Sequence, residues 1–424
     1  MTAPGSIVIV GAGQTGAVAA RTLRELGYAG ALTLVGDETH LPYERPPLSK
    51  EALGAGVDGG VGRMHSLQYY ADQGIELIAG ATARALDRER RQVVLSDGRC
   101  LDYDACLLAT GGRARRLPLL PESLPNVHVL RTLDDAMALG AALAPGVRLA
   151  VIGGGFLGLE AAWTAMQRGV AVTVVEGAPA LLGRVLPPEL SDWLLQRARG
   201  LGLDVRLGVS TTGAVPAATA AAGTTLALSA GGQVEADQIL VAIGLVPNTE
   251  LAVSAGLPLC EATAGVLVDA DCRTADPYVW AAGDCASQCR APDGQPVRME
   301  SWQNANTHGA LAAASMLQAA RPAAPYPWFW TDQLGCNIQI LGAPQPGLDY
   351  VVRGAARPGD DAPKLLCLGL RDGVPVHGVA INAGGDLRAL RALFEQAAAI
   401  DPAAFADPAT ALKPFVKSCL QRSA

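Results

Sequence analysis

Two glycine-rich stretches have the spacing that binds the pyrophosphate of a dinucleotide. The first, GAGQTG, spans residues 11–16, and the second, GGGFLG, spans residues 153–158. In a G-x-G-x-x-G pattern the glycines allow a tight turn and let backbone N–H groups approach a phosphate at a helix N-terminus. Two complete patterns predict two bound dinucleotides. The glycines expected to lie against them are Gly11, Gly13, Gly16, Gly153, Gly155 and Gly158.

The elements around each turn are those of a Rossmann unit. The apolar runs SIVIV (6–10) and RLAVI (148–152) predict buried parallel strands, and a helical pattern follows each turn. A second strand then ends at an acid, Asp37 in the first unit and Glu176 in the second. Such a carboxylate usually binds ribose hydroxyls, and the charge of Glu176 would repel a 2′-phosphate. The second site is therefore expected to prefer NADH over NADPH.

Two dinucleotides in one chain indicate a relay from a nicotinamide donor to a flavin acceptor. Two later stretches favour a flavin in the first site. ACLLATGG (105–112) predicts a buried strand that breaks at glycines, and VWAAGDCA (279–286) predicts a short strand that ends at Gly283-Asp284. At the mouth of a parallel sheet, Asp284 can accept a hydrogen bond from a ribityl hydroxyl.

Composition excludes several other classes of protein. Half of the 424 residues are apolar and 17% are charged, so sizeable cores can form, and no apolar run is long enough to span a bilayer. The net charge of −7 argues against non-specific nucleic-acid binding. Nine cysteines without C-x-x-C spacing predict buried thiols rather than a disulfide framework or a metal site. The N-terminus runs straight into a strand, so we expect a cytoplasmic protein without a signal peptide or a membrane contact.

In the order of its motifs the chain resembles the FAD-dependent NADH:ferredoxin reductases of bacterial oxygenase systems, of the putidaredoxin reductase and biphenyl dioxygenase reductase type. The matching stretches cover nearly the whole chain: VGAGQTG, GDETHLPYERPPLSK, VVLSDGR, LLATGG, LRTLDDA, VIGGGFLGLE, AIGLVPN, AAGDCA, ESWQNA and PWFWTDQ.

The resemblance implies an α/β, glutathione-reductase-like fold with two Rossmann-type dinucleotide-binding domains and a C-terminal α+β domain. With the linkers read from proline-rich stretches, the FAD domain is expected at 1–112 and 245–327, the NADH domain at 113–244, and a C-terminal interface domain at 328–424. Residues 208–232 are expected to form poorly determined strands and turns.

The resemblance also assigns cofactor contacts by position, with FAD in the first site and NADH in the second. It places Trp330 near the flavin ring from the C-terminal domain. The further residues assigned to cofactor binding are Thr15, Asp37, Arg45, Lys50, Ala83, Ala109, Arg131, Glu160, Glu176, Gly244, Asp284 and Trp302.

The loop ERPPLSK (44–50) is expected to carry the catalytic charge. Pro46 and Pro47 fix two φ angles and so lower the entropy lost in holding Lys50, while Ser49 is expected to cap a short helix. Lys50 would stabilise negative charge that develops near flavin N5. Because a cation in a nearly dry site needs a partner, we expect a Lys50–Glu160 contact of roughly 2.7–3.2 Å.

The expected electron acceptor is a [2Fe–2S] ferredoxin, bound transiently through charge. Because ferredoxins are usually acidic, arginines near the flavin strands are candidates for the docking rim. Two alternatives stay open: a pyridine-nucleotide disulfide or peroxide reductase on the same fold, and a binding protein gated by NADH. The first would need a thiol in the loop that here reads HLPYERPPLSK. The candidate docking residues are Arg113, Arg115, Arg116, Arg290 and Arg298.

Overall fold

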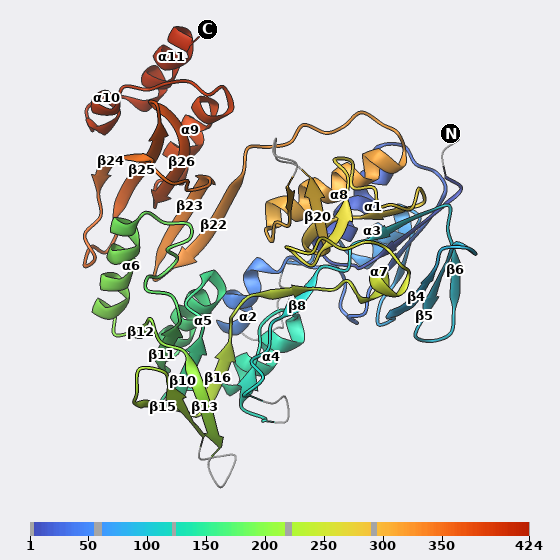
Figure 1. Cartoon of the computed structure of the whole chain (residues 1–424), viewed down its shortest axis with the longest axis horizontal. Helices are drawn as coiled ribbons and strands as arrows, with labels where there is room; N and C mark the ends of the chain where they lie inside the picture. The colour runs from blue at the N-terminus through green and yellow to red at the C-terminus, as the bar shows by residue number, and fades with distance from the viewer. Residues whose placement is uncertain (1–3, 55–61, 121–123, 217–222, 290–294, 424) are drawn as a thin grey trace. The chain divides into compact units, whose positions relative to one another are not determined.

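The computed structural model describes residues 4–54, 62–120, 124–216, 223–289 and 295–423. They form two compact units (Figure 1). The first comprises residues 1–47, 58–113 and 245–324, and the second comprises 48–57, 114–244 and 325–424. The end of the ERPPLSK loop, with Lys50, thus belongs to the second unit. The division into three domains stays a prediction. No helix in the described ranges is long and apolar enough to cross a membrane.

A five-stranded parallel sheet organises the first unit, in the order β19-β7-β1-β2-β3. Its strands are short and almost wholly buried, as their β-branched and apolar sequences predict. Their bounds are β1 (Ser6–Val10), β2 (Ala31–Val35), β3 (Ile75–Ile78), β7 (Ala105–Leu108) and β19 (Val279–Ala281).

Helices cover one face of this sheet. α1 (Gln14–Glu25) and α8 (Trp302–Met316) lie side by side (Figure 1), and their apolar residues join the strands in one core with α3 (Leu67–Asp72). Side chains on the other face of the parallel sheet form a second hydrophobic core with residues of an antiparallel sheet. This antiparallel sheet consists of β4 (Ala83–Asp87), β5 (Gln92–Leu95) and β6 (Cys100–Asp102).

Smaller elements complete the first unit. β8 (Gly112–Ala114) pairs with β17 (Leu245–Pro247) where the chain leaves and re-enters the unit. The others are α7 (Glu250–Ser254), β18 (Val266–Val268), the 3₁₀ turn η3 (Gly283–Cys285), β20 (Ala286–Cys289) and β21 (Pro296–Val297).

The second unit contains another five-stranded parallel sheet, in the order β12-β11-β10-β16-β9. Helix α5 follows its central strand β10 as α1 follows β1. The elements are β9 (Val127–His128), α4 (Leu133–Ala142), β10 (Arg148–Ile152), α5 (Phe156–Gln167), β11 (Ala171–Glu176), α6 (Pro188–Gly200), β12 (Asp204–Leu207) and β16 (Gln238–Val241).

The alanine- and threonine-rich stretch 208–232 is more regular than its composition suggests. β13 (Thr211–Pro216) and β14 (Thr224–Leu228) form an antiparallel sheet with β15 (Gln233–Ala236), and Leu226 is fully buried in it. The prediction of strands here is confirmed on both sides of residues 217–222, which lie outside the described residues.

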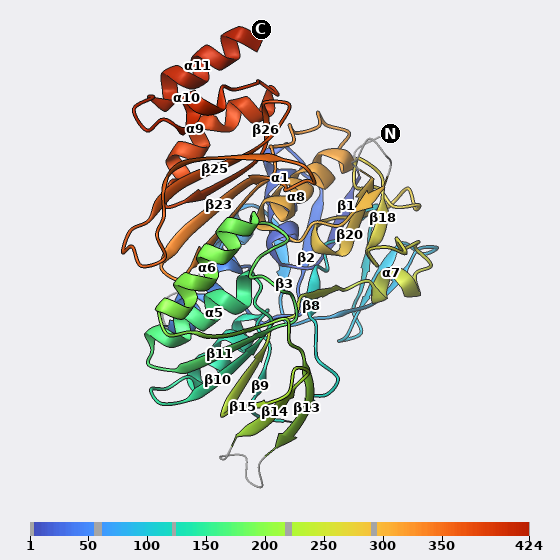
Figure 2. The ribbon, with the colours of Figure 1, turned by 60° about the vertical axis from the view of Figure 1, so that its left-hand side comes forward.

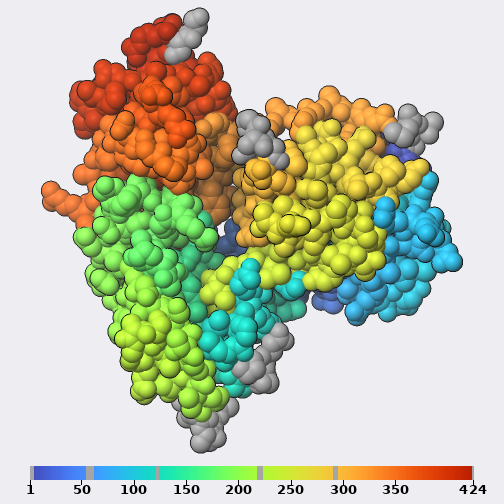
Figure 3. All heavy atoms as spheres, in the orientation of Figure 1, coloured from blue at the N-terminus to red at the C-terminus, as the bar shows by residue number. Residues whose placement is uncertain are grey.

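The C-terminal part of the second unit is an antiparallel sheet with helices packed on it (Figure 2). Arg197 of α6 connects this helix to the backbone of the C-terminal part. The buried guanidinium donates to the Leu334 carbonyl at 3.0 Å and the Asp360 carbonyl at 2.8 Å, and the two regions adjoin in Figure 3 (green and orange). The elements are β22 (Trp328–Gln333), β23 (Cys336–Gly342), β24 (Asp349–Ala355), β25 (Lys364–Arg371), β26 (Val374–Ile381), α9 (Gly384–Glu395), α10 (Pro402–Ala406) and α11 (Leu412–Ser423).

Candidate functional site

The first glycine-rich turn has the geometry that a pyrophosphate requires. Gly11 has φ +114°, and a Cβ on it would lie 2.1 Å from the carbonyl oxygen of Ala109. A Cβ on Gly16 would lie 1.9 Å from the Gly11 oxygen. Gly13 is different, because a Cβ on it would have Arg45 Nη2 as its nearest neighbour, at 3.9 Å. Two glycines are thus needed for backbone packing, and the middle one faces the space that a phosphate would enter.

Arg45 brings a positive charge to this turn. Its Nη2 pairs with Glu38 Oε1 at 2.8 Å, and Tyr43 donates to the other Glu38 oxygen at 2.6 Å. Burial alone would lower the pKa of Arg45, but Tyr43, Glu38 and Asp284 outweigh it and raise that pKa. The guanidinium is therefore permanently charged beside Gly13, where it fits a pyrophosphate.

Three of the other residues assigned to FAD in the first unit follow the carboxyl ends of strands in its parallel sheet, and two lie elsewhere. Asp37 is exposed after β2, and Ala109 is buried after β7. Asp284 lies in η3 after β19, and a Cβ on the preceding Gly283 would lie 2.3 Å from Thr15 Oγ1. Ala83 begins β4, and Trp302 begins α8.

The second turn repeats the first. Gly153 has φ +109°, and a Cβ on it would lie 2.3 Å from the Ala242 oxygen. A Cβ on Gly158 would lie 2.1 Å from the Gly153 oxygen, whereas one on Gly155 would meet nothing within 4 Å. The middle glycine again faces open space, so this turn also fits a pyrophosphate.

Glu176 is held in place at the end of β11. Its Oε2 accepts the N–H of Gly154 and its Oε1 accepts the N–H of Ala178, each at 2.6 Å. Each carboxylate oxygen has a second lone pair, so both can still accept a ribose hydroxyl. The backbone therefore orients the carboxylate as the predicted ribose contact requires.

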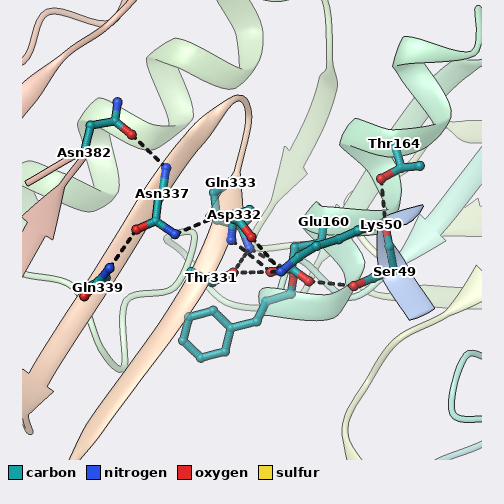
Figure 4. Close-up of polar contacts among 11 residues, drawn as sticks. Ser49, Lys50, Glu160, Thr164, Thr331, Asp332, Gln333, Asn337, Gln339 and Asn382 are labelled. Atoms are coloured by element: carbon teal, nitrogen blue, oxygen red, sulfur yellow. Dashed lines mark hydrogen bonds and ion pairs between the residues drawn. The ribbon is translucent and has the colours of Figure 1, made fainter. Parts of the chain in front are cut away.

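Lys50 lies in a charged cluster within the second unit (Figure 4). Its Nζ is 2.7 Å from Asp332 Oδ2 and 3.5 Å from Glu160 Oε1. The pairing with Glu160 forms, but it is longer than the expected 2.7–3.2 Å, and Asp332 of β22 is the closer partner. The reason is that other donors occupy Glu160: the Ser49 and Thr331 hydroxyls each at 2.6 Å and the Asp332 amide at 3.0 Å.

The expectation that Ser49 caps a helix needs the same correction. Ser49 ends the 3₁₀ turn η1 (Pro46–Ser49), and α2 (Glu51–Gly54) begins after Lys50. The Ser49 hydroxyl donates to Glu160, and the Ser49 carbonyl accepts the Thr164 hydroxyl at 2.8 Å. Both bonds join the end of the loop to α5, so they set the direction from which Lys50 projects.

The cluster keeps Lys50 protonated. Burial lowers its pKa, but Glu160 and Asp332 outweigh burial and raise that pKa above the usual value. Burial likewise raises the pKa of Asp332, but hydrogen bonds from Asn337 and Lys50 outweigh it and lower that pKa. An ammonium held between two carboxylates is thus a fixed feature over the ordinary pH range.

The remaining assigned residues lie in the second unit. Trp330 stacks on Trp328, with ring centroids 5.1 Å apart and planes at 20°. The Arg131 amide donates to Asp135 at the start of α4, and Gly244 is exposed with φ +103°. Sequence reasoning missed Thr331 and Asp332, although both lie in the stretch PWFWTDQ, where only Trp330 was selected.

The candidate docking arginines differ in their surroundings. Arg113 pairs with Glu250 at 2.7 Å, and Arg298 pairs with Glu300 at 2.6 Å. Arg115 and Arg116 are exposed. Arg290 lies outside the described residues.

Comparison with known proteins assigns this architecture to a family. Residues 5–309 match the pyridine nucleotide-disulphide oxidoreductase family, and residues 328–416 match the reductase C-terminal family. The chain is 38% identical over 395 residues to the 3-phenylpropionate/cinnamic acid dioxygenase ferredoxin–NAD(+) reductase component of Photorhabdus laumondii, covering 93% of this chain and 97% of the relative. It is 40% identical over 414 residues to the anthranilate 1,2-dioxygenase counterpart of Burkholderia cepacia, covering 96% and 98%.

Solved structures agree along nearly the whole chain. Putidaredoxin reductase in its covalent complex with putidaredoxin has a TM-score of 0.89 at 32% identity, covering 98% of this chain and 99% of that one. The ferredoxin reductase of the CYP199A2 system from Rhodopseudomonas palustris has a TM-score of 0.88 at 34% identity, covering 98% and 100%. The glutathione-reductase-like fold and the binding of FAD and NAD(H) follow from these matches and from the two fitted turns. The chain belongs to the pyridine nucleotide-disulphide oxidoreductase family, and its residues 328–416 belong to the reductase C-terminal family.

Proposed function

We propose that this protein is the NADH:ferredoxin reductase of an oxygenase system. One NADH is oxidised to NAD⁺ and H⁺, and two [2Fe–2S] ferredoxins each take one electron. When bound, the FAD supplies the conversion of one two-electron donor into two one-electron deliveries. The curated relatives named above are ferredoxin–NAD(+) reductase components, and this chain covers nearly their whole length.

The observation that carries the proposal is the charged cluster at the end of the ERPPLSK loop. A disulfide reductase needs a thiol against the flavin, whereas this loop ends in the Lys50 ammonium, bound by Asp332 and Glu160. Following the family resemblance, we assign Lys50 to the flavin ring, where its positive charge favours the reduced, more negative form. A cation there assists electron transfer and cannot form a covalent intermediate with sulfur.

The cysteine next to the predicted flavin contact does not favour the disulfide alternative. Cys285 follows Asp284 and is fully buried, and its Sγ lies 3.3 Å from the Ala282 carbonyl oxygen. Burial raises the pKa of this thiol. Since the thiolate is the nucleophile in disulfide exchange, Cys285 is poorly suited to that chemistry.

The remaining residues bind and orient the nucleotides. We assign the turn at 11–16 with Arg45 to the FAD pyrophosphate, and the turn at 153–158 to that of NADH. Glu176 selects NADH, because a 2′-phosphate would meet its carboxylate. For the ferredoxin we propose a basic rim at Arg115 and Arg116, and we infer a cytoplasmic location, where NADH is supplied and the nine free thiols stay reduced.

Steady-state turnover with different acceptors tests the proposal. Purified holoenzyme with NADH should reduce a [2Fe–2S] ferredoxin much faster than it reduces oxygen or a small disulfide. Faster reduction of the disulfide, with an NADH-dependent rise in titratable thiols, would establish the disulfide alternative instead. Slow turnover with every acceptor would favour a binding protein gated by NADH.

A further inference from the structure

One buried histidine of the first unit has no place in the proposed chemistry. His308 lies in α8 and is 1% exposed. Its Nδ1 is 3.1 Å from the backbone nitrogen of Gly283, and its Nε2 is 3.1 Å from Gln288 Oε1. The imidazole therefore joins α8 to the turn that carries Asp284 and to strand β20.

These two contacts determine the protonation state of His308. The Gly283 N–H can only donate, so Nδ1 must accept. The Gln288 amide nitrogen donates to the Ala270 carbonyl at 3.0 Å, which leaves its oxygen facing Nε2 as an acceptor. Only a neutral imidazole with its proton on Nε2 satisfies both contacts. Gln288 thus selects the tautomer that Gly283 needs.

The Gly283 turn is enclosed on its other side by the first glycine-rich turn. A Cβ on Gly283 would lie 2.3 Å from Thr15 Oγ1, and one on Gly309, next to His308, would lie 2.5 Å from the Thr15 carbonyl oxygen. Gly283 has φ +79°, a conformation that L side chains rarely adopt. Its backbone is therefore held between Thr15 of α1 and His308 of α8.

We propose that His308 is a positioning residue of the FAD site, which holds the Gly283 amide and thereby aims the Asp284 carboxylate. The inference rests on the assignment of Asp284 to FAD and adds a residue that no motif of the sequence includes. Without an acceptor at position 308, the buried Gly283 N–H would turn toward another partner, and the orientation of Asp284 would change with it.

Two nearly isosteric substitutions separate this role from simple packing. His308→Asn keeps an acceptor close to the Nδ1 position, whereas His308→Leu replaces it with a methyl group. The measurement is the rate of FAD loss from purified, diluted holoenzyme, followed by the rise of free-flavin fluorescence. We expect the Leu variant to lose FAD about tenfold faster and the Asn variant to stay within about threefold of the natural chain.

A second pair of variants tests the link through Gln288, even if His308→Leu does not fold. In the natural chain, Gln288→Leu should speed FAD loss about threefold, because Nδ1 is no longer fixed as the acceptor. In the His308→Asn background, which has no tautomer, the same change should have no further effect. Equal effects in the two backgrounds would overturn the proposal.

Asp284→Asn separates the assignment of Asp284 to FAD from the positioning role of His308. It should also speed FAD loss; if it does not, Asp284 is no FAD contact and the proposal fails with that assignment. If it does, but the Leu and Asn variants at 308 lose FAD equally fast, only the positioning role is overturned. Neither result depends on the ferredoxin assay, so the proposed function is tested separately.

Discussion

The two glycine-rich turns share one backbone design but differ in their surroundings. Gly11 and Gly153 have nearly the same φ, +114° and +109°, and in both turns a Cβ on the last glycine would meet the oxygen of the first. The acids that follow the second strands differ. Among the described residues, Asp37 makes no side-chain hydrogen bond, while Glu176 accepts two backbone N–H groups. The carboxylate expected to bind the ribose is therefore held more firmly in the second site than in the first.

The helices that follow the turns also differ. On α1 the inner face packs on α8 through small, apolar residues, and Gly309 allows the close approach. On α5, Glu160 and Thr164 bond to the end of the ERPPLSK loop. The same motif is thus part of a hydrophobic core in one unit and part of the charged cluster in the other. We infer a tightly held FAD in the first turn and an exchanging NADH in the second.

Alanine at the first glycine of each turn gives the largest expected effect. A Cβ at either position would lie within 2.3 Å of a carbonyl oxygen at an unfavourable φ, so the turn must distort. Gly11→Ala should yield protein that is purified without flavin. Gly153→Ala should retain FAD but lose roughly 100-fold or more in kcat/KM for NADH. Flavin absorbance and steady-state kinetics measure the two, and each variant is the control for the other. Loss of FAD from both would contradict the separation of the sites.

Removing the Lys50 charge should give the next largest effect. Lys50→Met should slow reduction of the flavin by NADH about 100-fold, as loss of one preorganised electrostatic group typically does. Asp332→Asn should slow it far less, because the ammonium remains. Anaerobic stopped-flow absorbance provides the rates. Lys364→Met is the matched control, since Lys364 forms an exposed pair with Asp386 at 2.9 Å in the same unit. A Lys50→Met rate equal to that control would remove Lys50 from the chemistry.

The difference between the two acids predicts which one sets nucleotide preference. Glu176→Ser should lower the ratio of kcat/KM for NADH to that for NADPH about tenfold, since the charge that repels a 2′-phosphate is gone. Asp37→Ser should leave this ratio unchanged and affect only FAD retention. A shift caused by Asp37→Ser alone would reverse the assignment of the two turns, and a shift caused by both substitutions, or by neither, would contradict it.

Neither turn is expected to contact the electron acceptor, which should bind at the proposed rim of Arg115 and Arg116. Charge reversal at both arginines should lower kcat/KM for ferredoxin about fivefold at low salt and flatten its salt dependence. Reduction of the flavin by NADH should not change. Arg113→Glu is a comparison that reverses one charge in the same stretch and leaves Arg115 and Arg116 unchanged. An unaltered salt profile in the double variant would place the docking surface elsewhere.

The Lys50–Asp332 pair also predicts a pH range for stability. The pKa of Lys50 is raised in the folded protein. Its contribution to the free energy of unfolding is therefore complete below the unfolded-state pKa of about 10.4 and is lost as pH rises through the folded-state pKa. The Asp332 pKa is lowered, so its contribution is present above about 3.9 and is lost as pH falls through the folded value. At pH 7, Asp332→Asn should lower Tm by about 2 °C, and the difference should vanish in acid. A difference independent of pH would exclude the ion pair as its source.

Local features were predictable from the sequence because their causes are local. The two turns follow from glycine spacing and flanking strands, and SIVIV and RLAVI form strands with the predicted bounds. The partner of Lys50 was assigned incompletely for the opposite reason. Glu160 was chosen because it follows a recognisable turn, but Asp332 approaches through the pairing of β22 within the C-terminal sheet. Sequence spacing carries no information on that approach.

His308 illustrates the same limit. As a histidine near a helix start it carried no distinctive signal, and its role depends on a glycine amide and a glutamine brought together only in the folded unit. Ser49 had a plausible local partner, the following helix, and instead donates to Glu160 at 2.6 Å. A charge-assisted hydrogen bond to a buried carboxylate outweighs a cap on a single helical turn.

Anaerobic titration of the holoenzyme with NADH, followed by visible absorbance, tests the central claim most directly. One equivalent of NADH should bleach the flavin completely, with no change in titratable thiols, and oxidised [2Fe–2S] ferredoxin should then restore the flavin spectrum. A flavin that NADH does not bleach, or a second equivalent consumed with the appearance of new thiols, would contradict electron transfer from NADH through FAD to ferredoxin.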